Sequence, residues 1–343
     1  FQSPEHSYTK ALLACRPTNN VGKKRLPVVS DFISTAESVN TPSGNTEVQS
    51  VDDIVALGNQ IKTFDESQMR AGRVEIKQEP IISVQHLSKR YKSNRKLFAK
   101  PSPPFVAVDD VSFDIFRGET LGLVGESGCG KTTLSRTLLM LIPPSDGKIL
   151  FNGSDIAQYN REQLRRLRKQ IQIIFQDPYG ALNPRITAGD AIAEVLLFHK
   201  VVSVKSAAYK RAGELLERVG LLPAHLQRYP HEFSGGQRQR LCIARALAVE
   251  PEVIVCDESV SALDVSVQAQ VLNLLKDLQD EFKLTYLFIS HDLSVIRFMC
   301  DRVMVMQYGK IVESNHVERL FSNPQTDYTQ RLLAAIPGRA AAY

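Results

Sequence analysis

One stretch of sequence decides the fold of this chain: Gly125-Glu126-Ser127-Gly128-Cys129-Gly130-Lys131-Thr132, followed by Thr133. It matches the phosphate-loop pattern G-x-x-x-x-G-K-[ST], in which glycines let backbone N–H groups curl around the β- and γ-phosphates of a nucleotide. Lys131 would add a fixed positive charge, and Thr132 would place its hydroxyl on Mg²⁺. The helix that begins near Gly130 would direct its positive N-terminus at the anion. We therefore predict that the whole stretch through Thr133 binds a nucleotide.

The sequence on either side supplies the strand and the helix that such a loop requires. Leu121–Val124 has the apolar composition of a short buried strand. Thr133–Leu141 has a helical pattern, which Pro143 and Pro144 end. A glycine-rich run by itself can be an ordinary turn, but strand, loop and helix in this order favour nucleotide binding.

Composition and charge exclude several classes of protein. The five cysteines are scattered and form no C-x-x-C pair, which indicates a reducing compartment and argues against structural zinc. No apolar run reaches the roughly 18 residues of a membrane helix, so membrane association would need a partner subunit. The net charge of +5 is mild, and its densest cluster, Arg161–Lys169, has the spacing of a solvated helix face. We therefore expect no nucleic-acid partner.

The segments before the phosphate loop differ in composition. Residues 17–79 are rich in polar and charged residues, and we predict a flexible linker there, with at most a weak helix near Val51–Phe64. Apolar and polar residues partly alternate from Ile81 to about Ile115, which predicts antiparallel strands. A basic loop, Lys89–Lys100, interrupts these strands.

Beyond the phosphate loop, short apolar runs alternate with helix-like segments, which is typical of an α/β core with buried strands. The runs are Ile171–Phe175, Val253–Cys256, Tyr286–Ile289 and Val303–Met306. Residues 187–249 carry only helical patterns, so we predict a short helical subdomain inserted between core strands.

The first residues take part in an internal repeat. The pattern Phe1-x-x-Pro4-x-x-x-Tyr8-Thr9-x-x-Leu12-Leu13-Ala14 recurs in the same register as Phe321-x-x-Pro324-x-x-x-Tyr328-Thr329-x-x-Leu332-Leu333-Ala334. Two chance amphipathic helices are the alternative, but the matched gaps favour duplication. We therefore expect residues 1–16 to be the C-terminal tail of a preceding nucleotide-binding domain, and the chain to be the second half of a longer tandem protein.

Two adjacent carboxylates end the apolar run at Val253: Asp257 and Glu258. Carboxylates at the end of a buried strand are costly unless positive charge meets them, and a magnesium nucleotide provides that charge. Asp257 would hold the metal or its water, while Glu258 would orient and deprotonate the water that attacks the γ-phosphate. An acidic N-cap of the following helix is the alternative role for this pair.

Two further polar residues follow apolar runs, and one further segment lies beyond Glu258. His291 comes after Tyr286–Ile289, where its imidazole, a donor and an acceptor, could bond the γ-phosphate. Gln176 follows Ile171–Phe175, where its amide could reach Mg²⁺ or water. Ser261-Ala262-Leu263-Asp264 lies just beyond Glu258 and would form a turn at an interface.

These motifs, in this order, resemble those of the ATP-binding cassette (ABC) family. They are joined by Phe233-Ser234-Gly235-Gly236-Gln237, which is similar to the family's signature motif. The resemblance covers residues 80–337, which include a helical subdomain at about 187–249. Residues 338–343 would form a tail after the cassette. It implies an α/β P-loop NTPase fold with a RecA-like core, an N-terminal antiparallel β-subdomain and an inserted helical subdomain.

The resemblance also implies a mechanism in which two nucleotide-binding domains close head to tail around ATP and Mg²⁺. The signature residues Ser234, Gly235, Gly236 and Gln237, together with Asp264, would complete the site on the other domain. That site would hold Lys131, Thr132, Gln176, Asp257, Glu258 and His291. Tyr91 is the candidate for stacking on adenine, although a surface aromatic beside Lys89 and Arg90 explains it nearly as well.

Longer segments are similar to the dipeptide, oligopeptide and nickel importer ATPases. They are Phe175–Arg185, Tyr229–Arg240 and the closing Tyr328-Thr329 segment. The resemblance implies bacterial import rather than export, with a permease as partner and, indirectly, a periplasmic or extracellular solute-binding protein. The chain would then lie at the cytoplasmic face of the inner (plasma) membrane, paired with a second cassette on the same polypeptide or in a second copy. The cargo stays open among peptides, nickel, glutathione and opines.

Two alternatives are weaker. A cytosolic ABC ATPase of DNA repair or translation would need a long coiled coil or zinc modules, but fewer than sixty residues separate Gln176 from Ser234 and no cysteines pair. A cassette that only binds ATP is opposed by Glu258 and His291. Cys129 replaces the serine more usual in the loop, which could make the site sensitive to thiol oxidation.

Overall fold

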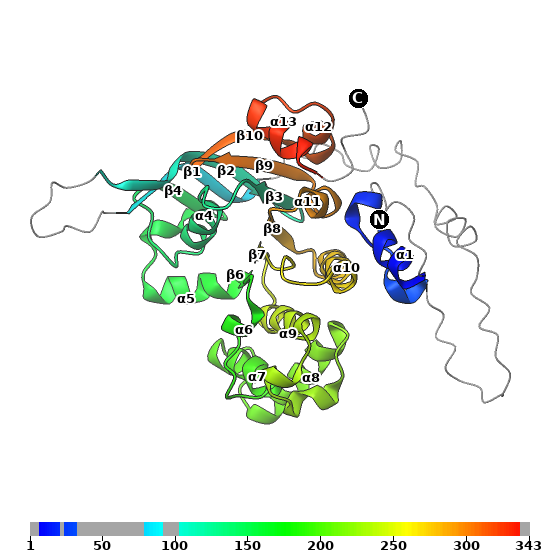
Figure 1. Ribbon diagram of the computed structural model, residues 1–343. Helices are drawn as coiled ribbons and strands as arrows, with labels where there is room; N and C mark the ends of the chain where they lie inside the picture. Colours follow the sequence, from blue (N-terminus) through cyan, green and yellow to red (C-terminus); the bar gives the residue numbers. More distant parts are fainter. Residues whose placement is uncertain (1–6, 21–23, 33–78, 92–102, 337–343) are drawn as a thin grey trace, which may run out of the picture.

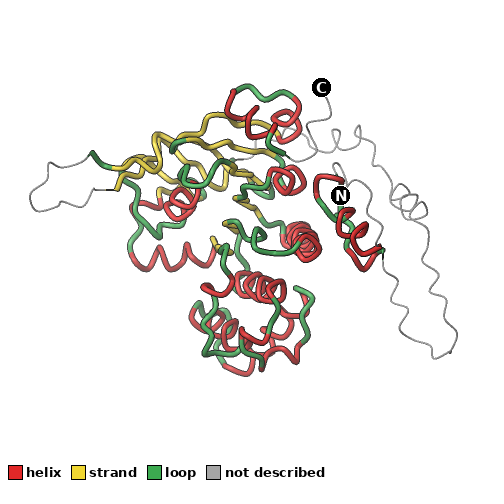
Figure 2. Tube along the Cα trace, in the orientation of Figure 1, coloured by secondary structure: helices red, strands yellow, loops and turns green. Residues whose placement is uncertain are grey.

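The computed structural model describes residues 7–20, 24–32, 79–91 and 103–336. Figures 1 and 2 show two β-sheets and the helices packed around them. The helix predicted near residues 51–64 and the tail at 338–343 lie outside the described residues. Among the described residues, no helix combines the length and apolar character needed to cross a membrane.

The first sheet is antiparallel and has the strand order β2-β1-β4-β5. Its strands are β1 (Pro80–Tyr91), β2 (Phe105–Phe116), β4 (Asp146–Phe151) and β5 (Ser154–Asp155). This sheet confirms the predicted N-terminal antiparallel β-subdomain. One local prediction is wrong, because Lys89, Arg90 and Tyr91 continue β1 and pair with β2 instead of opening a loop.

The second sheet is the core and has the strand order β10-β9-β3-β8-β7-β6. Its strands β3 (Thr120–Val124), β6 (Ile171–Ile174), β7 (Val253–Asp257), β8 (Thr285–Ile289) and β9 (Arg302–Gln307) run parallel, and β10 (Lys310–His316) pairs antiparallel at the edge. Every residue of β3, β7 and β8 is buried, as expected for aliphatic strands covered on both faces.

Helices cover the core sheet and form one separate group. Around the sheets lie α4 (Lys131–Leu138), α5 (Arg161–Gln170), α10 (Val265–Phe282), α11 (Leu293–Met299), α12 (Val317–Ser322) and α13 (Asp327–Ala334). Between β6 and β7 come α6 (Pro178–Ala181), α7 (Ala188–Phe198), α8 (Lys205–Arg218) and α9 (Gly235–Leu247). In Figure 1 this second set forms the group at the bottom, which is the inserted helical subdomain.

The start of the chain packs against the cassette. It contains α1 (Ser7–Ala14) and two short 3₁₀ turns, η1 (Pro17–Asn19) and η2 (Val29–Asp31). Leu26 is 1% exposed, and its backbone N–H and C=O bond the two ends of the Asn273 side-chain amide, at 2.9 and 2.8 Å. Part of the segment predicted as linker is therefore held on α10.

The internal repeat has a structural counterpart. Tyr328 and Tyr8 occupy the same repeat position, and the helices that contain them, α13 and α1, have eight residues each. Helix α1 runs from Ser7 to Ala14, and α13 runs from Asp327 to Ala334, so both helices begin and end at equivalent repeat positions. The repeated sequence thus forms the same helix in the same register twice.

Candidate functional site

Parallel strand register brings the predicted site residues to one edge of the core sheet. Leu123 of β3 and Asp257 of β7 both pair with Ile289 of β8, and Ile174 of β6 pairs with Cys256. The loops that leave these four neighbouring strands therefore begin at the same level. They carry, in spatial order, the phosphate loop, His291, Glu258 and Gln176. The carboxyl edge of such a sheet is where α/β proteins bind ligands.

The phosphate loop needs glycine at two positions for steric reasons. Gly125 and Gly130 have φ values of +154° and +115°, in the range that favours glycine. A Cβ atom at Gly125 would lie 2.2 Å from the carbonyl oxygen of Met306, and one at Gly130 would lie 2.2 Å from that of Ala107. The loop therefore lies directly against the β9 and β2 backbones.

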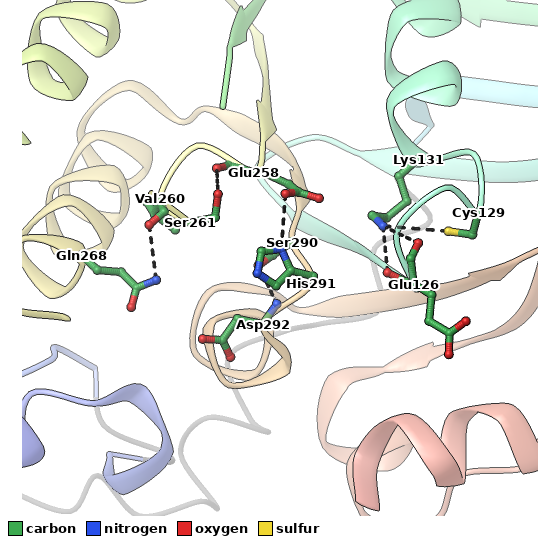
Figure 3. A network of polar contacts seen from close by, with 11 residues as sticks. Glu126, Cys129, Lys131, Glu258, Val260, Ser261, Gln268, Ser290, His291 and Asp292 are labelled. Carbon is green, nitrogen blue, oxygen red and sulfur yellow. Dashed lines mark hydrogen bonds and ion pairs between the residues drawn. The ribbon is translucent and has the colours of Figure 1, made fainter. Parts of the chain in front are cut away.

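Lys131 lies inside this loop. It is 5% exposed, and its Nζ donates to the carbonyl oxygens of Gly125 and Glu126, at 2.8 and 2.9 Å (Figure 3). It is also the first residue of α4, and the N–H groups of a helix's first turn have no acceptor within the helix. Thr132, the next residue, is exposed and free to meet a ligand. A helix N-terminus with backbone donors and one cation suits an anion such as a phosphate chain.

Cys129 is poorly suited to redox chemistry. It is 8% exposed, and this burial raises the pKa of its thiol, although the nearby Lys131 acts in the opposite direction. A raised pKa disfavours the thiolate, which is the reactive form. The structure therefore does not support the expected sensitivity to thiol oxidation.

Asp257 is a buried carboxylate at the end of β7. It is 6% exposed, and burial raises the pKa of its side chain, while a hydrogen bond from Ser135, 3.3 Å from Oδ2, lowers it. A charge in this position gains from a bound cation, and carboxylate and hydroxyl oxygens are ligands that Mg²⁺ prefers. The donor set of Asp257 and Thr132 thus fits the predicted metal.

Glu258 and His291 face each other across neighbouring strand ends. Glu258 Oε2 lies 3.3 Å from His291 Nδ1 (Figure 3). Glu258 has a φ of +49°, its N–H donates to Ile289, and its carbonyl accepts from the Ser261 hydroxyl. The left-handed backbone conformation at Glu258 turns the chain away from the direction of β7. The alternative that these carboxylates cap the next helix is wrong, because the N-cap of α10 is Asp264.

The signature lies at the start of α9. Ser234 caps this helix: its hydroxyl accepts from Gln237 N–H, and the Gln237 side chain accepts from Ser234 N–H. Ser234 and Gly235 are exposed, whereas a Cβ on Gly236 would lie 2.2 Å from a Val267 methyl carbon. Within the described residues, no hydrogen bond or ion pair joins residues 233–237 to residues 125–133. Figure 1 shows α9 in the helical group, on the other side of β6 and β7 from α4.

Asp264 and Gln176 belong to exposed turns near the signature. Asp264 caps α10 by accepting from Val267 N–H at 3.0 Å. Gln176 is exposed in the loop after β6. Just beyond it, the Tyr179 ring lies 3.6 Å from the guanidinium carbon of Arg238 on α9. The Gln176 loop is thus attached to the helix that begins with the signature.

Tyr91 ends β1 and is 40% exposed. It pairs with Phe105, two residues before Ala107, whose carbonyl borders the phosphate loop. The Lys89 ammonium lies 5.3 Å from its ring centre. Its place on β1, next to the β2 strand that borders the loop, is compatible with adenine stacking, which stays a prediction.

Two residues contact the site although the sequence analysis did not predict it. Ser135, one turn into α4, bonds Asp257. Tyr328, in α13, bonds the backbone of Glu126. The recurring Tyr-Thr motif drew attention to Tyr328, but nothing in the motif indicates contact with a loop 202 residues away.

Comparisons with known proteins agree with this geometry. A family model described as "ABC transporter" matches residues 108–261. The oligopeptide transport ATP-binding protein OppF of Bacillus subtilis is 52% identical over 260 residues, which are 76% of this chain and 83% of OppF. The glutathione import ATP-binding protein GsiA of Escherichia coli K12 is 45% identical over 342 residues, 98% of this chain and 50% of GsiA. The chain thus spans about half the length of GsiA.

Solved structures show the same fold. The dimeric cassette MJ0796, in a post-hydrolysis state bound to ADP and Pi, superposes with a TM-score of 0.62 and 28% identity over 69% of this chain and 98% of that protein. Clostridium perfringens cbiO1 gives a TM-score of 0.62 and 28% identity over 72% of this chain and 92% of cbiO1. With the site geometry and the 52% identity to OppF, these matches show that the chain belongs to the ABC transporter family.

Proposed function

We propose that this chain hydrolyses ATP to power the import of peptides or related small solutes through a membrane permease. The observation that carries the ATPase role is the meeting of Lys131, Asp257, Glu258 and His291 at one edge of the core sheet. The direction of transport and the class of cargo are supported by the similarity to OppF and GsiA, whose names describe oligopeptide transport and glutathione import. The relatives do not favour a role in DNA repair or translation.

ATP would bind with its phosphates inside the loop 125–133. Lys131 and the first backbone N–H groups of α4 would neutralise the β- and γ-phosphates. Thr132, Asp257 and Gln176 would hold Mg²⁺, which supplies positive charge to the phosphate oxygens. The adenine would extend toward Tyr91 on β1.

Glu258 would act as the general base. A water molecule attacks the γ-phosphorus, its proton moves to the Glu258 carboxylate, and the bond from the γ-phosphorus to the bridging oxygen breaks, leaving ADP and phosphate. His291, 3.3 Å from Glu258, orients the carboxylate and would donate to the γ-phosphate. Loss of the phosphate then removes a partner of His291.

A second cassette would complete the site. Ser234, Gly235, Gly236 and Gln237 would approach the γ-phosphate of the partner, with Asp264 at the same interface. ATP would hold the two cassettes together, and hydrolysis would remove the contacts that favour closure. Cycles of closure and opening would change the access of the attached permease, with a solute-binding protein delivering cargo outside. The cassette would lie on the cytoplasmic face of the membrane.

We further propose that residues 1–16 derive from a preceding cassette and that residues 17–79 connect it to the cassette at 80–337. The repeated helix supports this, since α1 and α13 share one register. The match to GsiA supports it too, because it covers 98% of this chain but half of that relative. Sequencing the gene upstream of Phe1 tests the proposal: a second phosphate loop there is expected, and an unrelated reading frame would contradict it.

The Glu258→Gln variant tests the catalytic role. Gln cannot accept the proton of the attacking water, so we expect steady-state ATPase turnover to fall by about a hundredfold or more, while ATP affinity in calorimetry stays near that of the unchanged protein. Lys131→Ala is the reference for lost binding, because it removes the fixed charge of the loop. Near-normal turnover of Glu258→Gln would remove Glu258 from its role as base. Permease and solute-binding genes beside this gene would support import, and their absence would count against it.

A further inference from the structure

The C-terminal helix α13 reaches the phosphate loop from outside the segment that the family model matches. Tyr328, in the first turn of α13, is 6% exposed, and its hydroxyl oxygen accepts a hydrogen bond from the backbone N–H of Glu126 at 3.1 Å. Glu126 is the second residue of the loop. The contact therefore ties a distant helix to the main chain of the nucleotide site.

The peptide unit between Gly125 and Glu126 is bonded on both sides. Its N–H donates to Tyr328, and its carbonyl oxygen accepts from Lys131 Nζ at 2.8 Å. No described peptide bond is cis, and in a trans peptide the N–H and C=O point in opposite directions. A rotation of this peptide that breaks the bond to Tyr328 therefore also moves the carbonyl away from Lys131.

We propose that Tyr328 is a positioning residue that fixes the Lys131 ammonium through the Gly125–Glu126 peptide before ATP arrives. The proposal rests on the proposed function, in which Lys131 binds the phosphates of ATP. A preorganised cation binds its anion more tightly, because no ordering of the loop is needed on binding. Tyr328 would thus act on ATP affinity without touching ATP.

The position of Tyr328 is itself fixed by a buried carboxylate. Glu313 on β10 is 8% exposed and accepts hydrogen bonds from Gln325 N–H, at 2.9 Å, and from both the N–H and the hydroxyl of Thr326, at 3.1 Å. Thr326 in turn caps α13 by accepting from Thr329 N–H. The turn before α13 is therefore anchored to the core sheet, and the helix presents Tyr328 in one orientation.

The C-terminal part of the chain contacts the phosphate loop at a second point. Gly309 N–H, in the turn between β9 and β10, donates to the carbonyl oxygen of Cys129 at 2.9 Å. The loop thus makes one hydrogen bond near each end with the C-terminal part of the chain: it donates at Glu126 and accepts at Cys129. Cys129, inside the loop, offers a native thiol whose accessibility reports loop movement.

The first experiment measures iodoacetamide labelling of Cys129 without nucleotide, resolved by mass spectrometry. Tyr328→Phe keeps the buried ring and removes the hydroxyl, so we expect Cys129 to react about fivefold faster, the ratio that corresponds to one lost hydrogen bond. Glu313→Gln weakens the anchor of α13 and should shift the rate in the same direction. Tyr308→Phe is the matched control, because Tyr308 lies in the neighbouring turn, is 83% exposed, and should leave the rate unchanged.

The second experiment measures ATP binding by calorimetry and steady-state kinetics. Tyr328→Phe should raise the Kd and the KM for ATP about fivefold and change kcat by less than twofold, since Glu258 and His291 are untouched. A purely structural role would instead lower the melting temperature and kcat together. Unchanged labelling and unchanged ATP affinity in Tyr328→Phe would overturn the proposal.

A double variant separates this inference from the proposed function. If Tyr328 acts with Lys131 through the shared peptide, Tyr328→Phe should accelerate Cys129 labelling much less in a Lys131→Ala background than in the unchanged protein. Equal acceleration in both backgrounds would refute the coupling. These rates are measured without ATP, so they stand even if the ATPase assignment fails.

Discussion

At the scale of single residues, Asp257 and Glu258 are neighbours with opposite surroundings. Asp257 is buried at the end of β7, where Ser135 of α4 donates a hydrogen bond to it. The Glu258 side chain, in contrast, is 19% exposed and lies beside His291. The enclosed residue suits a metal ligand, which needs a fixed position. The accessible one suits a base, which must meet water. Their adjacent places on one strand end therefore suit two different chemical tasks.

Burial of Asp257 predicts that Asp257→Asn stabilises the nucleotide-free protein while abolishing magnesium-dependent hydrolysis. Burial raises the pKa of Asp257, so the folded state holds its proton more tightly than the unfolded state does, and stability falls as pH rises through that raised pKa. Asn carries no charge to desolvate. A gain on the order of 1 kcal/mol would raise the melting temperature at pH 7 by about 2–4 °C in calorimetry.

The pH trend provides the control. The stability difference between the two proteins should vanish at low pH, where Asp257 is protonated, and be complete at neutral pH. Asp264→Asn should leave the melting temperature unchanged at either pH, because Asp264 is exposed and Asn is an equally good N-cap. A lower melting temperature for Asp257→Asn at pH 7 would show that its charge is already compensated.

The positions of site residues were predictable where a motif states them and not where distant segments meet. Lys131, Glu258 and His291 lie where the sequence predicts, because each follows an aliphatic strand and parallel strands end at one edge. The hydrogen bonds of Ser135 and Tyr328 depend on how α4 and α13 pack, which no local pattern encodes. The thiol of Cys129 illustrates the same limit, because burial, which the motif does not encode, raises its pKa more than the neighbouring Lys131 lowers it.

At the scale of elements, α6 and α9 are joined by two arginines. Arg238 stacks on Tyr179, and Arg245 donates to the carbonyl oxygen of Ala181 at 2.6 Å. Arg238 is also 5% exposed and donates to the carbonyl oxygen of Pro230, so its guanidinium is held in place. Movement of the Gln176 loop would therefore be passed to the helix that presents Ser234.

Tyr179→Ala should loosen this junction. A cation–π contact with a desolvated guanidinium contributes about 1–2 kcal/mol, so amide hydrogen exchange at residues 178–182 should accelerate about tenfold, while β3 stays protected. We expect kcat for ATP to fall and ATP affinity to be retained. Tyr229→Ala is the control, since Tyr229 is another partly exposed tyrosine of the helical subdomain, stacked on His231. Unaltered exchange at 178–182 would mean that Arg245 alone holds α6.

The elements themselves were predictable to different degrees. The four aliphatic core strands lie within a residue or two of their predicted bounds, because strands buried on both faces need continuous apolar runs. β10 was not predicted: it lies at the sheet edge, and its sequence Lys310–His316 is mostly polar. β4 and β5 were missed as well, since Gly147 and a two-residue strand give no period to recognise.

At the scale of the whole molecule, the described residues contain the predicted parts of an ATP site, but two of these parts lie apart. The phosphate loop and the signature belong to different parts of the fold, with the sheet end and α6 between them (Figure 1). An exposed helix N-terminus capped by Ser234 is ready to face a partner. The geometry fits the proposal that one cassette supplies half of each of two sites.

Complementation of two inactive variants tests this arrangement. Ser234→Arg blocks the signature and Lys131→Ala disables the phosphate loop, so each variant alone should be inactive. If the site forms between two chains, mixing them creates one intact site in each mixed dimer. ATPase activity should then return to about a quarter of normal, given random pairing of equal amounts.

The control replaces Lys131→Ala by the double variant that carries both substitutions, which leaves no intact site in any dimer. Recovery in that mixture, or full activity of Ser234→Arg alone, would place the complete site within one chain. Absence of recovery despite mixed dimers seen by native mass spectrometry would contradict pairing of Lys131 with the partner's signature.

The contact between Asn273 and Leu26 has a practical consequence. Asn273 is 3% exposed and bonds the main chain of Leu26 through both ends of its amide, so it recognises the backbone of this segment and not a particular side chain. A shortened protein that starts at residue 79 keeps every motif but leaves that amide without partners in an apolar surrounding. Expression trials should therefore retain residues 7–32, because purification yield and solubility will depend on residues that no functional motif includes.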